Sequence, residues 1–302
     1  MRLRRLTLTL ALLAVVGALG ASSAQGACTT WSQRTELSGQ GLLENLAFDH
    51  RSALLLSAST QDAILRVDRR GNVEHLIDDV NAPGGLRVRG DVLFFNTGDS
   101  AISGLQNLSD GTIERFRFKT GQRSVYAQGL TMPNGLIFLP NGDAVVSRDI
   151  GTGTGMTRIP AGDPEHPELN WARLDDTNGM AVDPGGRYLY TVATFRPEAP
   201  VYRIKIKDPS RIRVVAELGE GGGLLALDDM TIDRRGRLFI AANLAGEVIR
   251  LNPDTGASCV IASDLQNPSA VKFGRGRGWS NRSLYVTGFD GTVKRLTPPG
   301  TS

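Results

Sequence analysis

Short apolar runs separated by turn residues recur along most of the chain. Residues 227–256 show the pattern most clearly, because Met230 and Ile232 alternate with polar neighbours and two further apolar runs follow, at 238–242 and 248–251. Glycine-containing turns separate the runs. Strands joined by such short turns pair as antiparallel neighbours. This stretch therefore predicts a β-meander.

The meander recurs six times, each copy opening with a key residue that is followed by alternating apolar positions. The key residues are Glu44, Gly84, Asn134, Asn178, Asp228 and Ser269, spaced by 40, 50, 44, 50 and 41 positions. A second apolar run follows each of them, at 53–57, 92–96, 144–147, 188–192, 238–242 and 284–287. Each interval accommodates four short strands, which is typical of propeller blades. The sequence predicts an all-β, six-bladed β-propeller.

The two ends of the repeat indicate how the ring closes. The sixth copy has only three strands of its own, the last near residues 291–296, whereas residues 29–37 form a spare strand before the first copy. Pairing of these segments would remove a free sheet edge. A large β-sandwich is the alternative fold, but its strands need not repeat at a long fixed period. No segment after residue 26 has a sustained helical pattern, so no helix is predicted.

The first 26 residues have the features of a secretory signal peptide. Arg2, Arg4 and Arg5 precede the apolar run 6–20 and the small residues 21–24. The alternative is a retained membrane anchor, for which the apolar run is short. Cleavage would leave residues 28–300 as a single secreted domain, extracellular or periplasmic, with no membrane association.

Charge and cysteine content limit the possible partners. The formal charge of +3 falls to about zero when the three leader arginines are removed (3 minus 3), so nothing indicates nucleic acid or an anionic membrane as a partner. A monomer acting on a small molecule is expected. Cys28 and Cys259 are the two cysteines of the chain, and in an oxidising compartment they can form one disulfide. Two free thiols are the alternative, because sequence does not give their separation.

The key residues should meet around one mouth of the central channel. Glu44 and Asp228 would contribute carboxylates, and Asn134 and Asn178 would contribute carboxamides. Taken singly, Asn or Asp beside Gly is also common in turns. Taken as a ring, these oxygen donors suit a hard divalent cation such as Ca²⁺, Mg²⁺ or Mn²⁺. Without a cation the two carboxylates would repel each other.

With Glu44 in the first blade, Asn134-Gly135 in the third, Asn178-Gly179 in the fourth and Asp228 in the fifth, the chain resembles the SMP-30/gluconolactonase family of six-bladed propellers. The resemblance implies a divalent-metal-dependent hydrolase that opens lactones or related esters. It implies Glu44, Asn178 and Asp228 as metal ligands, Asp228 also as the catalytic base, and Asn134 as a substrate contact. Ca²⁺ is the expected ion, with Mg²⁺, Mn²⁺ or Zn²⁺ as alternatives.

Several positions depart from the pattern of the family. Members that act on sugar lactones tend to have Arg two residues before the third-blade Asn and an acid after it, where this chain has Met132 and Gly135. A substrate other than a sugar lactone is therefore expected. Asn45 and Asp229 replace the usual Gly, and this Leu-Glu-Asn and Leu-Asp-Asp form resembles a divergent branch. A natural-product cyclase and a non-catalytic binding propeller are the alternative functions.

The ends of the second strands should reach the same mouth. They carry Asn96, Arg148, Asp149 and Asn243. Asn96, Arg148 and Asn243, with Met132 and Asn134, make up the predicted substrate-binding set. Arg148 could stabilise an oxyanion or bind a carboxylate. Alternatively, it could be a solvated loop residue without a role in binding. The sequence contains no Gly-x-Ser-x-Gly elbow, His-Glu-x-x-His motif or phosphate-binding glycine loop, which argues against serine hydrolases and nucleotide-dependent enzymes.

Overall fold

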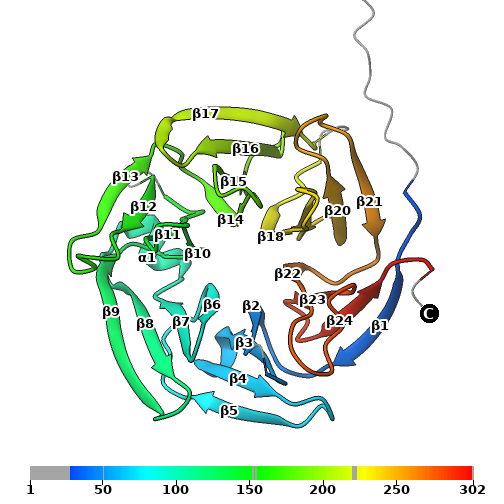
Figure 1. Ribbon diagram of the computed structural model, residues 1–302, viewed down its shortest axis with the longest axis horizontal. Helices are drawn as coiled ribbons and strands as arrows, with labels where there is room; N and C mark the ends of the chain where they lie inside the picture. The colour runs from blue at the N-terminus through cyan, green and yellow to red at the C-terminus, as the bar shows by residue number, and fades with distance from the viewer. Residues whose placement is uncertain (1–27, 50, 152, 154, 220–222, 301–302) are drawn as a thin grey trace, which may run out of the picture.

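The computed structural model describes residues 28–300 except 50, 152, 154 and 220–222, so the predicted signal peptide, 1–26, lies outside the described residues. The strands form six four-stranded antiparallel sheets arranged around a central axis (Figure 1). The predicted six-bladed β-propeller is confirmed.

The first three blades follow the chain in simple meander order. Blade 1 contains β2 (Leu43–Phe48), β3 (Leu54–Ala58), β4 (Ala63–Val67) and β5 (Val73–Ile77). Blade 2 contains β6 (Leu86–Arg89), β7 (Val92–Thr97), β8 (Gly111–Arg117) and β9 (Gln122–Leu130). Blade 3 contains β10 (Leu136–Phe138), β11 (Ala144–Val146), β12 (Met156–Ile159) and β13 (Glu168–Ala172).

The next two blades repeat this order, and the last combines both ends of the chain. Blade 4 contains β14 (Thr177–Val182), β15 (Tyr188–Ala193), β16 (Pro200–Lys205) and β17 (Asp208–Glu217). Blade 5 contains β18 (Leu227–Ile232), β19 (Leu238–Ala242), β20 (Glu247–Leu251) and β21 (Ser258–Ala262). Blade 6 contains β22 (Pro268–Phe273), β23 (Leu284–Gly288), β24 (Val293–Thr297) and, outermost, β1 (Ser32–Leu37).

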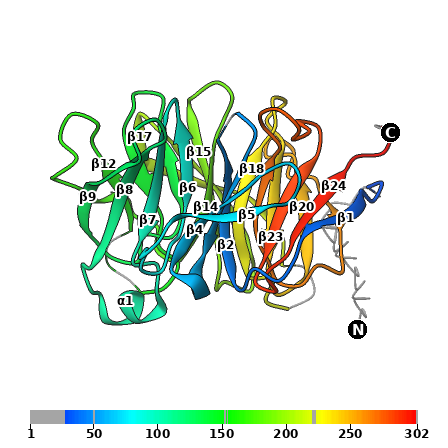
Figure 2. The same ribbon diagram turned by 90° about the horizontal axis from the view of Figure 1, so that it is seen from below.

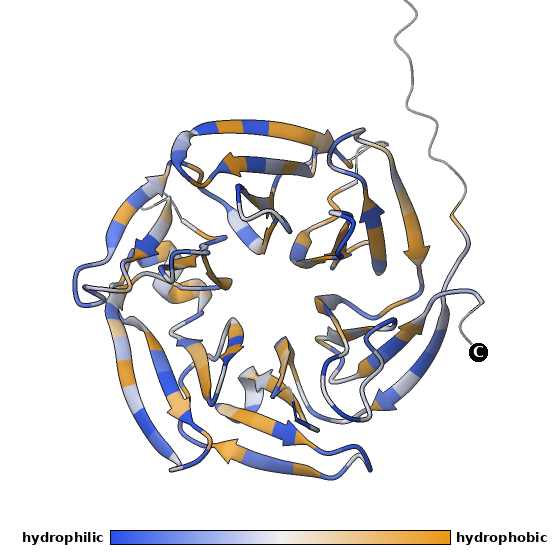
Figure 3. Cartoon of the chain, viewed as in Figure 1, coloured by the Kyte–Doolittle hydropathy of each residue, from blue (hydrophilic) through white to orange (hydrophobic). Residues whose placement is uncertain are grey.

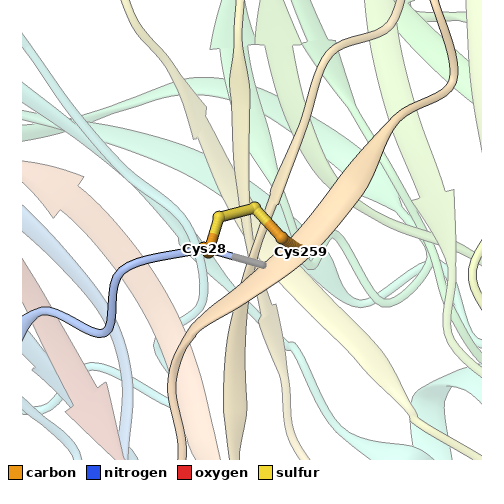
Figure 4. Close-up of a disulfide and its surroundings, with 2 residues drawn as sticks. All are labelled: Cys28 and Cys259. Carbon is orange, nitrogen blue, oxygen red and sulfur yellow. A yellow bond between two sulfur atoms is a disulfide. The ribbon is translucent and has the colours of Figure 1, made fainter. Parts of the chain in front are cut away.

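Ring closure takes place in blade 6, as predicted. Strand β1 pairs antiparallel with β24, with Ser32 opposite Thr297 and Thr35 opposite Lys294. Just before β1, the backbone N–H of Trp31 donates to the carbonyl of Ile261 at 2.8 Å. The expected disulfide is present between Cys28 and Cys259 on β21 (Figure 4), and it joins positions 231 residues apart. The N-terminal segment therefore contacts both blade 5 and blade 6.

The apolar core lies within and between the blades. Second strands such as β3 are buried on both faces, whereas outermost strands such as β17 alternate between hydrophobic and hydrophilic residues (Figure 3). Between blades 1 and 6, Phe48 packs against Trp279 and Tyr285 with ring centroids 5.5 and 5.4 Å apart. Such edge and tilted contacts are favourable arrangements for aromatic rings. This packing joins the end of β2 to blade 6.

One short helix was not predicted from the sequence. Helix α1 (Ala101–Gln106) follows β7, and its N-cap Ser100 accepts a hydrogen bond from the backbone N–H of Ser103. The helix ends at Asn107 in the left-handed conformation. Six residues are too few to show a helical period, which explains why the sequence pattern missed it. Across the described residues, no helix has the length and apolar character needed to cross a membrane.

All inner strands run in the same direction along the channel. They are β2, β6, β10, β14, β18 and β22. Their first residues therefore gather at one mouth, together with the loops that follow each second strand. We call this end the carboxylate mouth, since Glu44 and Asp228 lie there. Helix α1 projects from the same face (Figure 2).

Candidate functional site

The six key residues open the inner strands at the carboxylate mouth. Glu44, Asn178, Asp228 and Ser269 are each the second residue of their strand, whereas Gly84 and Asn134 lie two residues before theirs. Ser269 Oγ donates to the carbonyl of Leu43 at 2.6 Å and so links blades 6 and 1. A Cβ atom at Gly84 would lie 2.9 Å from Asp99 Oδ2. Gly84, the key residue of blade 2, therefore leaves space for the carboxylate of Asp99.

Asn134 connects two carboxylates at the mouth. Its Nδ2 donates to Asp99 Oδ2 at 3.2 Å and lies 3.4 Å from Glu44 Oε1. Sequence reasoning did not select Asp99, which follows Gly98 in the loop after β7. Its position could have indicated it, because Asp99 lies in the loop of blade 2 that corresponds to the loop of Asp149 in blade 3, and Asp149 was among the predicted residues of the mouth. The structure thus adds a carboxylate from blade 2 to the predicted ring.

Two more amide–carboxylate pairs complete the mouth. Asn178 Nδ2 donates to Asp149 Oδ2 at 3.4 Å, and Asn243 Nδ2 donates to Asp228 Oδ2 at the same distance. Asn243 is itself held by Asn267, whose Nδ2 donates to Asn243 Oδ1 at 3.2 Å. All four members of the two pairs are buried. Four carboxylates from blades 1, 2, 3 and 5 therefore gather at this mouth, each beside an asparagine side chain: Glu44, Asp99, Asp149 and Asp228.

The electrostatics of this mouth strongly favour protonated carboxyls or a bound cation. Burial raises the pKa of Glu44 to about 8, and the negative charges of Asp149 and Asp229 add to the effect. Burial also raises the pKa of Asp149 to about 7. For Asp99 and Asp228, burial followed by repulsion from Glu44 raises the pKa well above its usual range. A divalent cation would offset these charges.

The donor atoms present fit such a cation. Asp99 Oδ1 and Asp149 Oδ1 are buried and have no hydrogen-bond partner among the described residues. An orphaned buried carboxylate oxygen is costly unless something else binds it. Within the described part of the chain, no three acidic, histidine or cysteine side chains form a metal site by themselves, so an amide such as Asn178 would have to complete the set. Carboxylate and amide oxygens suit Ca²⁺ or Mg²⁺.

Three of the predicted substrate-binding residues support the wall of the mouth. Asn96 Nδ2 donates to the carbonyl of Asn134 at 2.9 Å, which fixes the start of blade 3. The Arg148 guanidinium donates to the carbonyls of Gly104 and Ile150, each at 2.6 Å, and so holds α1. Met132 lies beside α1, because a Cβ atom at Gly104 would meet its sulfur. A direct contact of these side chains with substrate stays a prediction.

A second polar layer lies one step deeper in the channel. Asn45 Nδ2 donates to Asp229 Oδ2 at 3.1 Å, and Lys272 forms an ion pair with the same carboxylate. Lys272 Nζ also donates to the carbonyl of Met230 at 3.0 Å. Burial lowers the pKa of Lys272 to about 8. Sequence reasoning missed Lys272, although it lies three residues after the key Ser269, at a channel-facing position of the repeat.

Comparison with known proteins supports the resemblance seen in the sequence. Residues 162–289, which cover β13 of blade 3, all of blades 4 and 5, and β22 and β23 of blade 6, match the family described as SMP-30/Gluconolactonase/LRE-like region. Over these residues, which are fewer than half of the chain, the protein is similar to this family. Regucalcin of Xenopus laevis is 27% identical over 143 residues, which are 45% of this chain and 46% of that protein. The chain thus aligns with about half the length of this curated relative, and the resemblance seen in the sequence is confirmed.

Solved structures extend the similarity to nearly the whole propeller. A gluconolactonase from Xanthomonas campestris has 19% identity and a TM-score of 0.71 and covers 89% of this chain and 90% of its own. The calcium-binding protein regucalcin from Agrobacterium tumefaciens has 14% identity and a TM-score of 0.70, covering 89% and 95%. Virginiamycin B lyase from Staphylococcus aureus has 12% identity and a TM-score of 0.59, covering 89% and 99%. At such identities the similarity establishes the fold alone.

Proposed function

We propose that the protein is a divalent-metal-dependent hydrolase that opens lactones or related esters. The observation that carries this proposal is the set of four carboxylates at one channel mouth, two of which have a buried oxygen without a hydrogen-bond partner among the described residues. The match of residues 162–289 to the SMP-30/gluconolactonase family supports the reaction class. Ca²⁺ is the proposed ion, since the donors are carboxylate and amide oxygens.

In this proposal Glu44, Asn178 and Asp228 would hold the ion. Asp149, which lies beside Asn178, would add a further ligand oxygen. A divalent cation held there would polarise a substrate carbonyl and lower the pKa of a bound water. Asp228 is the proposed base, which takes a proton from the attacking water. The bond from Asn243 to Asp228 Oδ2 fixes the orientation of that carboxylate. Asn134, held by its bonds to Glu44 and Asp99, is proposed to contact substrate.

The rim of the same mouth supports a substrate with an apolar part. Six large hydrophobic side chains in its loops are exposed to solvent: Ile102, Leu105, Leu108, Phe195, Leu224 and Leu244. The side chains of α1 are among the most exposed, with Ile102 at 64% and Leu105 at 71%. Exposed apolar groups around a polar site commonly mark a binding surface. We therefore propose an alkyl- or aryl-substituted lactone in preference to a sugar lactone.

We also propose that the protein is exported. The bond between Cys28 and Cys259 supports an oxidising compartment, because disulfides persist there and are rare in the cytosol. The basic, apolar and small-residue pattern of the first 26 residues supports the same destination. Mass spectrometry of the secreted protein would test this by locating its N-terminus, which should lie close before Cys28. An intact leader on the mature protein would contradict export with cleavage.

The first test of function is the metal content of the purified protein, followed by its melting temperature with and without chelator. One bound Ca²⁺ whose removal lowers the melting temperature is expected, because a ligand that binds only the folded state stabilises it. Asp228→Ala should lose both the metal and the hydrolysis of alkyl lactones. Asp254→Ala, at an exposed turn of blade 5, is the matched control. A metal-free protein that is indifferent to chelator would overturn the proposal.

A further inference from the structure

The opposite mouth of the channel contains a large basic cavity. Its volume is about 1350 Å³, and it is lined by the ends of the inner strands and by the loops 233–235 and 274–282. Six basic side chains line it: Arg87, Arg234, Arg235, Lys272, Arg275 and Arg282. We call this end the basic mouth. Neither the metal site nor the proposed hydrolysis makes use of it.

Acidic residues neutralise part of this lining and leave most of its positive charge unpaired. Asp233 is the acidic residue among the described lining residues, and it is already bound to Arg237, whose Nη2 lies 2.6 Å from Asp233 Oδ2. Arg234, Arg235, Arg275 and Arg282 are exposed and form no ion pair among the described residues. Their charges therefore add to the potential inside the cavity.

The floor of the cavity carries an excess of positive charge. Arg87 on β6 and Lys272 on β22 both lie near Asp229, which is the one carboxylate they share. The oxygens of Asp229 already accept bonds from Lys272, Asn45 and the backbone N–H of Met230. Among the described residues, Arg87 makes a single side-chain hydrogen bond, 2.8 Å long, to the carbonyl of Leu86. Most of its donors thus remain available to a ligand.

The arrangement around Arg87 is costly unless an anion joins it. Burial lowers the pKa of both Arg87 and Lys272, and for Lys272 the positive charge of Arg87 acts in the same direction. A charged group in such a place is stabilised by a partner that is both ionic and hydrogen-bonding. The planar guanidinium presents a fork of donors that matches carboxylate and phosphate oxygens.

We propose that the basic mouth binds a small, multiply charged oxyanion that carries carboxylate or phosphate groups. Arg87 and Lys272 form the floor of this site, and the arginines of loops 233–235 and 274–282 form its rim. A compact ligand fits better than a polymer, because the two floor residues lie inside the channel, where the inner strands converge. The proposal is independent of the metal site, which lies at the other end of the same channel.

The test is isothermal titration of the full-length mature protein, freed of divalent metal, with inorganic phosphate and separately with succinate at low ionic strength. Saturable binding of at least one anion is expected, and it should weaken as salt screens the charges. Binding of phosphate alone or of succinate alone would assign the ligand group. The absence of saturable binding by both anions would overturn the proposal.

Variants locate the bound anion. Arg87→Met should weaken binding about tenfold or more, since it removes a charge-assisted donor. Arg275→Met combined with Arg282→Met changes exposed loop residues only, so it tests the rim without risk to the fold. Arg211→Met, on the outermost strand of blade 4, is the matched control and should bind as the wild type does. Unchanged binding in both the floor and the rim variants would place the anion elsewhere and refute the site.

Discussion

Asn45 and Asp229 contact each other across the channel, with Asn45 Nδ2 donating to Asp229 Oδ2 at 3.1 Å. At these two positions the family resemblance predicts glycine, and the sequence has Asn and Asp instead. Their contact joins the inner strands of blades 1 and 5. The ion pair between Lys272 and Asp229 links the inner strand of blade 6 to them. The two departures thus form one buried polar layer beneath the carboxylate mouth.

Lys272→Met is expected to destabilise the protein by about 3 kcal/mol or more, because it leaves the Asp229 carboxylate buried without its cation. The free energy of unfolding in urea measures the loss. Lys119→Met, at an exposed turn, is the control and should change little. Adding Asp229→Asn to Lys272→Met should recover part of the loss. A double variant that is less stable than either single variant would contradict a coupled pair.

The stability of the metal-free protein should fall as pH rises from about 5 to 8. The folded-state pKa of Glu44 is raised to about 8 and that of Asp149 to about 7, so the folded state binds protons more tightly than the unfolded state. The stabilisation is complete below the unfolded pKa and is lost as pH rises through the folded pKa. A loss of about 2 kcal/mol is expected in urea unfolding. Glu44→Gln should flatten the slope, and a slope of opposite sign would refute the assignment.

Asp149→Asn should weaken Ca²⁺ binding about tenfold or more, because it replaces a carboxylate whose Oδ1 has no hydrogen-bond partner among the described residues. Calorimetric titration of metal-free protein with Ca²⁺ measures this change directly and does not depend on a substrate. Asp163→Asn, an exposed carboxylate of the same blade, is the matched control. Equal affinities of the two variants would remove Asp149 from the ligand set.

Arg148→Ala should release α1 from the wall of the mouth, since Arg148 donates to the carbonyls of Gly104 and Ile150. Loss of a buried charged donor predicts a destabilisation of about 2 kcal/mol and faster proteolysis within residues 98–110. Arg173→Ala provides an exposed control. Unchanged stability with a higher KM would instead support the substrate contact predicted from the sequence.

Replacement of both Cys28 and Cys259 by serine should cost about 2–4 kcal/mol, because the bond closes a loop of 231 residues in the unfolded chain. Thermal and urea unfolding measure the loss. Reducing agent should destabilise the wild type by a similar amount and leave the double variant unchanged. An equal response of both proteins to reduction would show that the bond contributes nothing.

The fold was predictable because a propeller repeats one local pattern. The key residues and the alternation after them marked six inner strands, and the missing strand of the last copy indicated how the ring closes. The positions of candidate residues were predictable where a residue opens an inner strand, as Glu44, Asn178 and Asp228 do. The places of Asp99, Arg87 and Lys272 in the repeat were readable from the sequence, but their burial and their partners were not, since these depend on which blades face one another. Helix α1 was missed because it is shorter than the window that reveals a helical period.

The pairing of β1 with β24 has a consequence for how the molecule is made. Strand β1 leaves the ribosome before the other strands of the propeller and β24 leaves it after them, so β1 has no partner until all six blades have been synthesised. Five blades can form in order as they emerge, whereas the sixth must wait. A chain that stops short of β24 leaves β1 as an open edge, which favours aggregation. Only a chain that has reached β24 can therefore close the ring and cover the edge of β1.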